Sequence, residues 1–467
     1  MTTRKADIVV IGAGSAGFSA AITAAEQGAS VVLVGWGTIG GTCVNVGCVP
    51  SKTLIRAAES VHAGVAVKRF AGIRGHLELV DWAALREQKN ALVAELRKAK
   101  YENLLLQYPQ IAYLRGRARL TEDGVTVGDV TVRAERIILT TGSRPAVPDL
   151  PGLDAVPWMD STAALDQESL PASMIVVGAG YIGVELAQTF ARFGVEVTLV
   201  CRRRLLPEAE PEISESLTRF FEEEGIRVLS GLRYREVRQA EGKIVLSAER
   251  DGAPLELSAE RLLLATGRRP NTEDLGLEEM GIALDAHGAI AVDAHMRTTH
   301  AGVYAAGDVT GRHMFVYMAA HGGKIAARNA LEGDLYSYDD SAVPAVVFSD
   351  PQVASVGLTE AAARDRGIAV ATSLLPLDQV PRALAARDTR GLIKLVADRG
   401  SRRLLGAHIL APEGADSIQS AALALRQGLT VSRLGETIFP YLTTVEALKL
   451  AAQTFDRDVS RLSCCAG

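Results

Sequence analysis

Short apolar runs that end in glycine recur along the chain. The β-branched run at residues 7–11 leads into Gly-Ala-Gly-Ser-Ala-Gly at residues 12–17, the first glycine motif. An alanine-rich stretch over residues 18–27 has the composition of a helix, and a second apolar run follows at residues 29–34. This order of strand, G-x-G-x-x-G, helix and strand predicts a dinucleotide-binding βαβ unit, because the helix N-terminus offers free N–H groups to a pyrophosphate.

The same pattern returns further along the chain. The apolar run at residues 173–177 ends in Gly-Ala-Gly-Tyr-Ile-Gly at residues 178–183, the second glycine motif, and the next strand is expected at residues 196–200. A spacing of about 170 residues is too long for a solenoid repeat, so the motifs predict two separate nucleotide-binding domains. In each motif the glycines permit a tight turn, a close approach to the pyrophosphate and helix–strand packing; they are Gly12, Gly14 and Gly17, then Gly178, Gly180 and Gly183.

Three further changes of pattern mark the organisation of the chain. Strands ending at Gly142 and Gly267, each with a proline three residues later, predict paired crossings from one domain to the next. Another strand, at residues 299–308, ends in Gly-Asp. Beyond residue 340 strands and amphipathic helices continue without a glycine motif, which we interpret as a third domain at a dimer interface. The expected α/β fold has domain boundaries at 1–148, 149–271, 272–340 and 341–467.

Composition narrows the class of protein. Of 467 residues 48% are hydrophobic and 44 are glycine, which is typical of a well-packed α/β enzyme. The net charge of -5 gives no reason to expect binding to nucleic acid or to anionic membranes. Five cysteines do not make a secreted disulfide scaffold, and no apolar stretch reaches the roughly 18 residues of a membrane span. We expect a soluble, cytoplasmic protein.

Four of the five cysteines form two pairs. Cys43 and Cys48 lie in Gly-Gly-Thr-Cys-Val-Asn-Val-Gly-Cys, soon after the first glycine motif, and Cys464 and Cys465 are adjacent near the C-terminus. Adjacent thiols do not readily form a relaxed disulfide, but both can bind one soft metal ion. The pairs therefore indicate chemistry on either a disulfide or a soft metal, whereas Cys201 is expected to be a packing residue.

The residue at the end of the second strand of each βαβ unit indicates which nucleotide that unit prefers. An acidic residue at that point binds a ribose 2′-hydroxyl. After the second motif the chain instead reads Cys201-Arg202-Arg203-Arg204, which suits a 2′-phosphate and favours NADPH over NADH. After the first motif the position is held by Gly35. FAD would then bind with a weaker ribose contact or with another residue in compensation.

With both motifs, the Cys-x-x-x-x-Cys segment and Ala-Ala-Gly-Asp-Val at residues 305–309, the chain resembles the pyridine nucleotide–disulfide oxidoreductases over nearly its whole length. Residues 347–360 resemble the start of the family's dimerisation domain. The resemblance implies two Rossmann-like domains for FAD and NADPH, a C-terminal α+β dimerisation domain, and a homodimer whose active sites use both subunits.

Within the family the chain is most similar to the branch that reduces mercuric ion. Tyr441 stands where the disulfide reductases carry an acid–base histidine, while Thr443 and Glu446 of that segment remain. Breaking a disulfide expels a thiolate that needs a proton, and a phenol, with an ordinary pKa near 10, supplies it poorly. Mercuric ion needs no such proton, because thiolates bind it directly. The loss of the histidine and the terminal cysteine pair both favour mercury.

The resemblance implies a role for each site residue. Cys48 is the thiolate nearest the flavin and Cys43 the outer thiol, and both are expected to have lowered pKa values at a helix N-terminus. Lys52 lies near the flavin and pairs with Glu185, and Tyr181 covers the flavin. Cys464 and Cys465 of the partner deliver Hg(II) to Cys43 and Cys48, past Tyr181 and Tyr441. The remaining cofactor positions are Ala16, Gly37, Gly41, Thr42, Ala118, Gly142, Asp308 and Val316 for FAD, and Arg202 and Arg203 for NADPH.

Two alternatives remain open at this stage. A reductase of glutathione, lipoamide or thioredoxin type shares every feature except the missing histidine and the terminal pair. A protein that sequesters metal or senses redox state through its thiols would bind metal stoichiometrically and not turn over. Gly35 leaves this alternative open, because a chain that fails to hold FAD cannot turn over. The chain shows no N-terminal Cys-x-x-Cys module of the kind found in many members of the mercury branch, which the protein either lacks or has lost.

Overall fold

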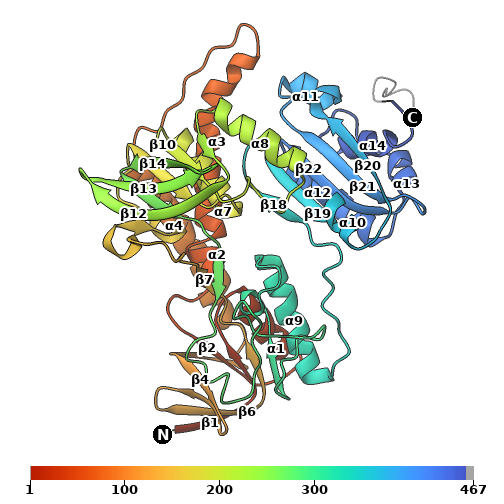
Figure 1. Ribbon diagram of the computed structural model, residues 1–467. Helices are drawn as coiled ribbons and strands as arrows, with labels where there is room; N and C mark the ends of the chain where they lie inside the picture. Colours follow the sequence, from red (N-terminus) through yellow and green to blue (C-terminus); the bar gives the residue numbers. More distant parts are fainter. Residues whose placement is uncertain (1, 459–467) are drawn as a thin grey trace. The chain divides into compact units, whose positions relative to one another are not determined.

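The computed structural model describes residues 2–458, and the chain forms two compact units, which Figure 1 traces in sequence colours. The first unit holds residues up to 53, 83–147 and 267–339, and the second holds residues 54–82, 148–266 and those from 340 onward. The expected cysteine pair Cys464 and Cys465 lies outside the described residues. The expected boundaries of four domains remain a prediction.

A seven-stranded sheet forms the centre of the first unit. Its order is β3-β2-β1-β6-β5-β4, with β17 beside β6, and β1, β2, β3, β6 and β17 run parallel. The strands at its centre are continuous apolar runs, as parallel strands covered on both faces require. The strands of this unit are β1 (Thr2–Ile11), β2 (Val31–Gly35), β3 (Ile111–Arg115), β4 (Ala118–Thr121), β5 (Gly124–Val127), β6 (Val130–Leu139), β7 (Ser143–Pro145), β16 (Arg268–Pro270) and β17 (Val303–Ala305).

Two helices from distant parts of the sequence lie side by side in the first unit. The Ser19 hydroxyl of α1 donates to the Ala320 carbonyl of α9 at 2.7 Å (Figure 1). Gly323 permits this contact, because a Cβ there would lie 3.0 Å from the Ala16 carbonyl carbon. The helices of this unit are α1 (Ser15–Glu26), α2 (Gly41–Asn45), the start of α3 (Cys48–Ala66), α4 (Trp82–Arg97, from residue 83), a π-helical turn η2 (Lys98–Glu102), α5 (Asn103–Leu105), η4 (Asp308–Thr310) and α9 (Val316–Glu332).

The predicted crossings are confirmed as a strand pair. β7 and β16 pair antiparallel, with Arg269 opposite Arg144, and the Ala146 N–H donates to the Gly267 carbonyl at 2.9 Å. Each strand adjoins a point where the chain passes between the units. Glycine and proline at these positions therefore mark the crossings, as the sequence indicates.

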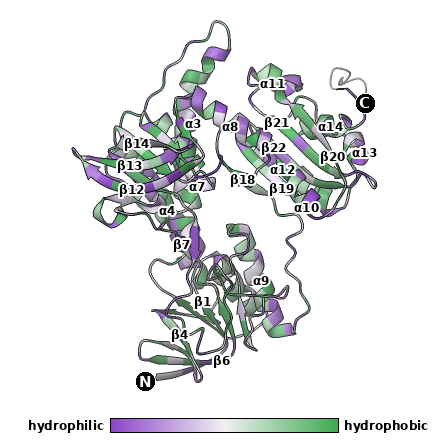
Figure 2. Cartoon of the chain, viewed as in Figure 1, coloured by the Kyte–Doolittle hydropathy of each residue, from purple (hydrophilic) through white to green (hydrophobic). Residues whose placement is uncertain are grey.

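The second glycine motif lies in a parallel sheet of order β11-β10-β9-β15-β8 in the second unit. A three-stranded antiparallel sheet, β12-β13-β14, accompanies it, and β12 is mainly hydrophilic (Figure 2). The elements are η1 (Val67–Arg69), η3 (Leu153–Ala155), β8 (Trp158–Met159), α6 (Ser161–Leu165), β9 (Ser173–Val177), α7 (Tyr181–Arg192), β10 (Glu196–Val200), α8 (Pro211–Glu223), β11 (Arg227–Leu229), β12 (Leu232–Ala240), β13 (Lys243–Arg250), β14 (Ala253–Ala259) and β15 (Arg261–Leu264).

The C-terminal region of the second unit is an antiparallel sheet of order β18-β19-β22-β21-β20 with helices packed against it. This matches the α+β architecture expected beyond residue 340. Its elements are β18 (Ala345–Val347), β19 (Gln352–Gly357), α10 (Glu360–Asp365), β20 (Val370–Pro376), η5 (Leu377–Gln379), α11 (Pro381–Ala386), β21 (Leu392–Asp398), β22 (Leu404–Ala411), α12 (Gly414–Arg426), α13 (Val431–Glu436) and α14 (Glu446–Gln453).

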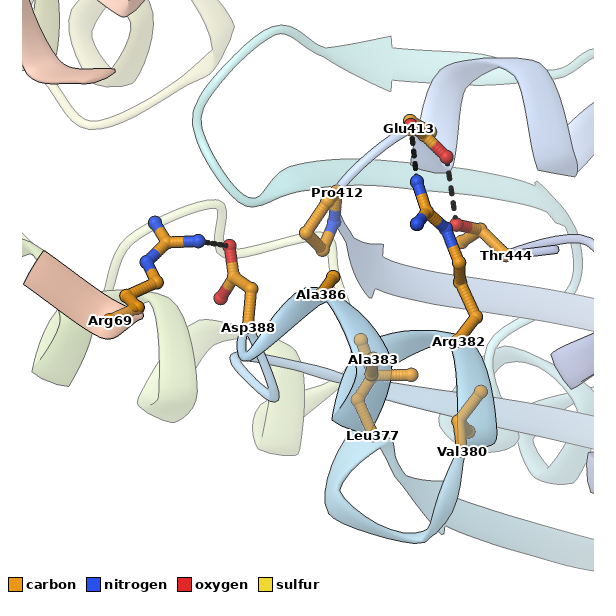
Figure 3. A pocket seen from close by; sticks show the side chains of 10 residues that line it. All are labelled: Arg69, Leu377, Val380, Arg382, Ala383, Ala386, Asp388, Pro412, Glu413 and Thr444. Atoms are coloured by element: carbon orange, nitrogen blue, oxygen red, sulfur yellow. Dashed lines mark hydrogen bonds and ion pairs between the residues drawn. The ribbon is translucent and has the colours of Figure 1, made fainter. Parts of the chain in front are cut away.

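A pocket of about 210 Å³ lies beside α11 in this region (Figure 3). Its floor is apolar, with Leu377, Val380 and Ala383, and its charged side chains are paired. Arg69 bonds Asp388 at 2.6 Å, and Glu413 accepts from Arg382 and from Thr444. None of the site residues expected from the sequence lines this pocket.

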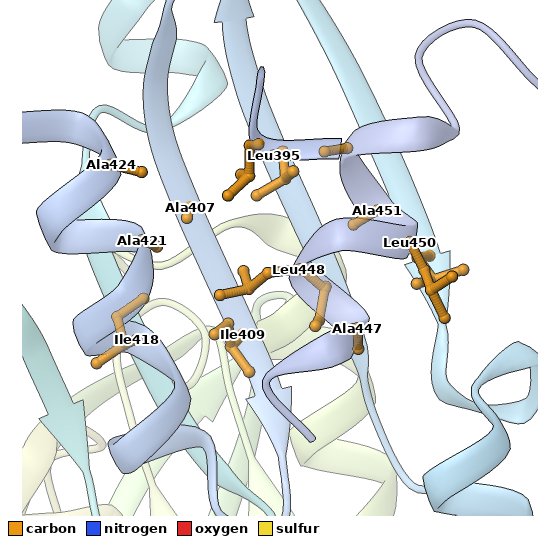
Figure 4. Packing of buried hydrophobic residues seen from close by; sticks show 14 of the residues in the cluster. Leu395, Ala407, Ile409, Ile418, Ala421, Ala424, Ala447, Leu448, Leu450 and Ala451 are labelled. Atoms are coloured by element: carbon orange, nitrogen blue, oxygen red, sulfur yellow. The ribbon is translucent and has the colours of Figure 1, made fainter. Parts of the chain in front are cut away.

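The core of the C-terminal region lies between its sheet and two helices. Leu395 of β21 and Ile409 of β22 meet Ile418 of α12 and Leu448 of α14, all almost completely buried (Figure 4). Burying each such side chain stabilises the fold by about 1.5–3 kcal/mol, so this core is sufficient to hold the segment after β22 in place. No helix within residues 2–458 is both long and apolar enough to cross a bilayer.

Two buried ion clusters connect the second nucleotide sheet to the C-terminal region. In one, Arg192 at the end of α7 bonds Glu224 at 2.7 Å and Asp350 at 2.8 Å. In the other, Lys394 of β21 bonds Glu210 at 3.0 Å. Removing one partner of such a buried pair leaves an uncompensated charge and costs about 3–5 kcal/mol. The clusters therefore fix the orientation of α7 and of the loop before α8.

Candidate active site

The two central cysteines come together at the start of two helices. Cys43 lies within the short helix α2, and Cys48 is the first residue of α3. Their side chains are hydrogen-bonded to each other, and the Cys48 backbone N–H also faces the Cys43 sulfur. Neither thiol is in a disulfide in the structure, and both are partly exposed. A five-residue spacing thus yields a dithiol in direct contact, which can close to a disulfide or bind one metal ion.

The pKa of Cys43 is raised, which is opposite to the expectation from the helix N-terminus alone. The hydrogen bond with Cys48 is the largest cause, and burial adds to it. The Cys48 N–H and the Lys52 ammonium act in the other direction but are outweighed. Two adjacent thiols titrate as one system, because the second proton leaves beside an existing thiolate. The prediction that both pKa values are lowered is therefore wrong for Cys43.

Tyr101 is a neighbour of the dithiol that the sequence does not single out. It lies in the π-helical turn η2, packs edge-on against Phe18 and hydrogen-bonds Ser15, the first residue of α1. Its pKa is raised by burial and, to a smaller extent, by Cys43 and Cys48. π-helical turns are frequent at functional sites. The π-helical turn η2 is therefore the structural feature that draws attention to Tyr101.

The first glycine motif has the shape that a pyrophosphate requires. Gly12 has φ of +120°, and a Cβ there would lie 2.8 Å from the Thr140 hydroxyl oxygen. Gly14 is the N-cap of α1, without a side-chain cap, and its backbone touches that of Gly41. The first turn of α1 carries no acidic residue. Free N–H groups and the positive end of the helix dipole are thus left for an anionic group.

Asp308 is held beside the first motif by two other residues. The Ser143 hydroxyl donates to the Asp308 carboxylate at 2.6 Å, and the Arg268 Nε donates to the Ser143 hydroxyl at 2.7 Å. Asp308 opens η4 after Gly307, which has φ of +78°. The carboxylate is partly exposed and therefore available to a hydroxyl-bearing ligand.

The remaining expected FAD positions are on separate elements of the first unit. Ala118 begins β4 and is buried, Val316 begins α9, and Thr42 is exposed on α2. Gly37 and Gly142 have positive φ, with open space where a Cβ would be. A Cβ on Gly307 would lie 3.0 Å from the Ala16 Cβ, so Ala16 brings α1 close to the loop before η4.

The second glycine motif has the same backbone conformation as the first. Gly178 has φ of +106°, and a Cβ there would lie 2.7 Å from the Ala265 carbonyl carbon. Gly180 caps α7 without a side-chain hydrogen bond, and no atom lies within 4 Å of the position a Cβ would take. The loop is open at the point where a dinucleotide would approach.

The arginines after β10 differ from one another. Arg204 donates to the carbonyls of Pro207 and Ala209, at 3.1 and 2.7 Å, so it holds its own loop. Arg203 is exposed and pairs with the exposed Glu208, and Arg202 lies over the Tyr234 ring at 5.7 Å. Two guanidinium groups are thus available to an anion. Cys201 is buried, which raises the pKa of its thiol to about 11, as befits a packing residue.

The comparisons with known proteins agree along the whole chain. The model of the pyridine nucleotide-disulphide oxidoreductases matches residues 6–323, and the model of their dimerisation domain matches residues 343–452. The chain belongs to the pyridine nucleotide-disulphide oxidoreductase family. It is 47% identical to a mercuric reductase of Streptomyces lividans over 99% of this chain and 98% of that one, and 47% identical to one of Acidithiobacillus ferrooxidans over 98% and 84%.

A solved structure shows the same fold. The chain superposes on the Cu(II) complex of the HOCl-induced flavoprotein disulfide reductase RclA from Escherichia coli with a TM-score of 0.86, at 31% identity, over 97% of this chain and 99% of that one. The protein is therefore an oxidoreductase of the flavoprotein disulfide reductase fold, and FAD and NADPH are the cofactors of its family. The glycine cradles, with space that a Cβ would fill, fit both groups.

Two family positions lie together on α7. Tyr181 is the first residue of the helix and is 40% exposed, and Glu185 is buried one turn later. Burial is the main cause that raises the pKa of Tyr181, and Glu185 adds to it. The Glu185 carboxylate accepts the Phe348 N–H at 2.9 Å. Pairing of Glu185 with Lys52 remains a prediction.

The segment before α14 presents Tyr441. The buried Glu446 carboxylate accepts the Leu442 N–H at 3.0 Å, and Leu442 has φ of +60°. This bond fixes the turn that leaves Tyr441 55% exposed. Glu446 thus orients the phenol through the backbone. Among residues 2–458 no group of three His, Cys, Asp or Glu side chains is arranged to hold a metal ion.

Proposed function

We propose that this protein reduces Hg(II) to Hg(0) with electrons from NADPH, through FAD and the Cys43–Cys48 pair. The observation that carries the proposal is the exposed Tyr441 phenol in the segment where disulfide reductases of the family carry a histidine. A phenol is a poor proton donor to a departing thiolate near neutral pH, whereas metal binding by thiolates needs no donor. The proposal is supported by relatives at 43–47% identity that are named mercuric reductases.

Cys43, Cys48 and Lys52 have different roles in the proposed reaction. When bound, FAD and NADPH supply the electron pair that opens the disulfide and later reduces the metal. Cys43 and Cys48 lie close enough to bind one Hg(II) between them. The Lys52 ammonium favours the thiolate of Cys43, as does the Cys48 N–H. The overall reaction balances: Hg(II) gains two electrons, and NADPH becomes NADP⁺ with release of one proton.

The family's dimerisation domain supports a second part of the proposal. Residues 343–452 carry that domain, so the enzyme acts as a homodimer. Cys464 and Cys465 of the partner subunit receive Hg(II) from small thiols and transfer it to Cys43 and Cys48 by ligand exchange. Tyr181 and Tyr441 line the route. Because the ion passes between thiols, it is never released free. Thiols that must stay reduced suit the cytoplasm.

The test is NADPH oxidation by the purified flavoprotein, with Hg(II) buffered by excess small thiol. Glutathione disulfide and lipoamide are offered in parallel. The proposal predicts turnover with Hg(II) alone, and its loss in the Cys464→Ala/Cys465→Ala double variant. Cys201→Ala is the matched control, since it removes a thiol outside the proposed route. Turnover with a disulfide but not with Hg(II) would refute the proposal, and stoichiometric binding without turnover would indicate a sequestering protein.

A further inference from the structure

The space beyond the end of β2 is already occupied by another side chain. Gly35 closes β2, where the acidic residue that binds an adenosine ribose would stand. A Cβ on Gly35 would lie 2.8 Å from the Ala13 Cβ and 2.8 Å from the Tyr113 Cε2, and nearer still to the Tyr113 hydroxyl. The phenol of Tyr113 therefore fills the volume in which an acidic side chain would begin.

The position of Tyr113 follows from the strand register. β3 runs parallel to β2, with Tyr113 beside Leu33 and Arg115 beside Gly35. Two residues along a strand span roughly 6.6 Å, about the length of a tyrosine side chain. The hydroxyl therefore reaches the carboxyl end of β2, near Ala13, the second residue of the first glycine motif. In open parallel sheets this end of the strands is where dinucleotides bind.

The hydroxyl has hydrogen-bonding capacity to spare. Within the part of the chain that the structure describes, Tyr113 makes no hydrogen bond through its hydroxyl. A phenol can donate one hydrogen bond and accept another. Since burial raises its pKa, it keeps its proton throughout the neutral range. A polar group of this kind, partly buried at a nucleotide cradle, is suited to a ligand hydroxyl.

We propose that the Tyr113 hydroxyl replaces the missing carboxylate and hydrogen-bonds a hydroxyl of the FAD adenosine ribose, with Gly35 small in order to make room. The change from a carboxylate to a phenol has a chemical consequence. A carboxylate can accept from both ribose hydroxyls at once, whereas one phenol oxygen offers a single donor and a single strong acceptor position. FAD is then held at the ribose by a neutral contact.

The test measures FAD binding and not activity. The full chain is stripped of flavin, and the FAD dissociation constant is measured by quenching of flavin fluorescence. Tyr113→Phe removes only the hydroxyl, and it is expected to weaken binding about three- to tenfold, the range of one neutral hydrogen bond. Tyr108→Phe is the matched control, because the Tyr108 hydroxyl bonds Glu26 at 3.1 Å on the surface. The control is expected to bind FAD as the parent does.

Deoxy analogues of FAD locate the contact. Two analogues are used, one without the 2′-hydroxyl and one without the 3′-hydroxyl of the adenosine ribose. In the parent, the analogue that lacks the contacted hydroxyl is expected to bind about three- to tenfold more weakly than FAD. With that analogue the penalty of Tyr113→Phe should vanish, because its partner is gone. Equal affinity of the parent for FAD and both analogues would overturn the proposal, even if Tyr113→Phe did not fold. So would an unchanged dissociation constant in Tyr113→Phe.

Discussion

The two glycine motifs have the same backbone conformation but differ in the residues that surround them. Gly12 and Gly178 have φ of +120° and +106°, and each faces a neighbouring strand end where a Cβ would collide. At the first motif that strand end is Thr140, whose hydroxyl lies 3.0 Å from the carbonyls of Ile11 and Gly12 and bonds them. At the second it is Ala265, which holds the turn through its backbone alone.

The strand that follows each helix differs as well. β2 ends at Gly35 beside the Tyr113 phenol, whereas β10 is followed by Cys201 and exposed arginines. We therefore interpret the glycines as the part of each motif that binds a dinucleotide, and the residues after β2 and β10 as the part that selects which one. The first turn is closed against Thr140, as suits the proposed resident FAD, whereas the second is open at Gly180, as suits the proposed co-substrate NADPH, which must leave.

The largest expected effect comes from adding a methyl group to the two motifs. Gly12→Ala combines positive φ with a collision against Thr140, and should cost about 3 kcal/mol or more and abolish flavin retention. Gly180→Ala meets open space at ordinary φ and should fold with its flavin, raising only the KM for NADPH. Thermal denaturation and the flavin absorbance of both purified variants give the comparison. Equal loss in both would show that the two turns are equally rigid.

A smaller effect is expected at the arginines after β10. Arg202→Ala/Arg203→Ala should raise the KM for NADPH about a hundredfold and leave the KM for NADH unchanged, since each charged hydrogen bond to a phosphate contributes about 1.5 kcal/mol, or about tenfold. Arg219→Ala, an exposed arginine on α8, is the control. Steady-state kinetics with both nucleotides provide the measurement. An equal rise for NADH would mean that the arginines do not recognise the 2′-phosphate.

Acid should weaken the second unit through the buried His408 and the half-buried His62. Burial lowers the pKa of His408 and His62 below 6.5, so between pH 6.5 and the lowered value the unfolded chain binds protons that the folded chain does not. Stability is therefore complete above pH 6.5 and falls as the pH drops, by at most about 1.4 kcal/mol per pH unit for each histidine. Urea denaturation at pH 5–8 measures it. His408→Gln should flatten the slope, and the exposed His76→Gln should not.

The smallest effect is expected at the remaining cysteine. Cys201 is buried and its pKa is raised to about 11, so it is neither reactive nor a metal ligand at neutral pH. Cys201→Ser should leave both nucleotide KM values unchanged, and the parent thiol should react with a thiol reagent only on unfolding. Rapid labelling in the folded protein would contradict its assignment as a packing residue.

The sequence predicts the nucleotide folds because their signals are local. β10 is observed at the expected residues 196–200, and the crossings at Gly142 and Gly267 pair as expected. The first helix begins at Ser15, three residues before the expected start, because the motif's own last turn is already helical. The sheet β12-β13-β14 is not anticipated, since its strands carry no glycine motif.

The contacts of the site are less predictable, because they join residues that are distant in sequence. Neither Tyr113 beside Gly35 nor Tyr101 beside the dithiol follows from a motif. The raised pKa of Cys43 depends on the sulfur that it touches, which overrides the helix N-terminus. Glu446 is anticipated as a site residue, but its bond to the Leu442 N–H requires the turn itself.

The most direct test of the account is the ratio of Hg(0) released to NADPH consumed. The flavoprotein is supplied with thiol-buffered Hg(II) in a sealed vessel, the volatile mercury is trapped, and NADPH is followed by absorbance. If Hg(II) is the substrate, one Hg(0) is released for each NADPH over many turnovers, and both signals are lost in Cys43→Ser. NADPH consumption without Hg(0), or a single stoichiometric uptake of Hg(II), would contradict it.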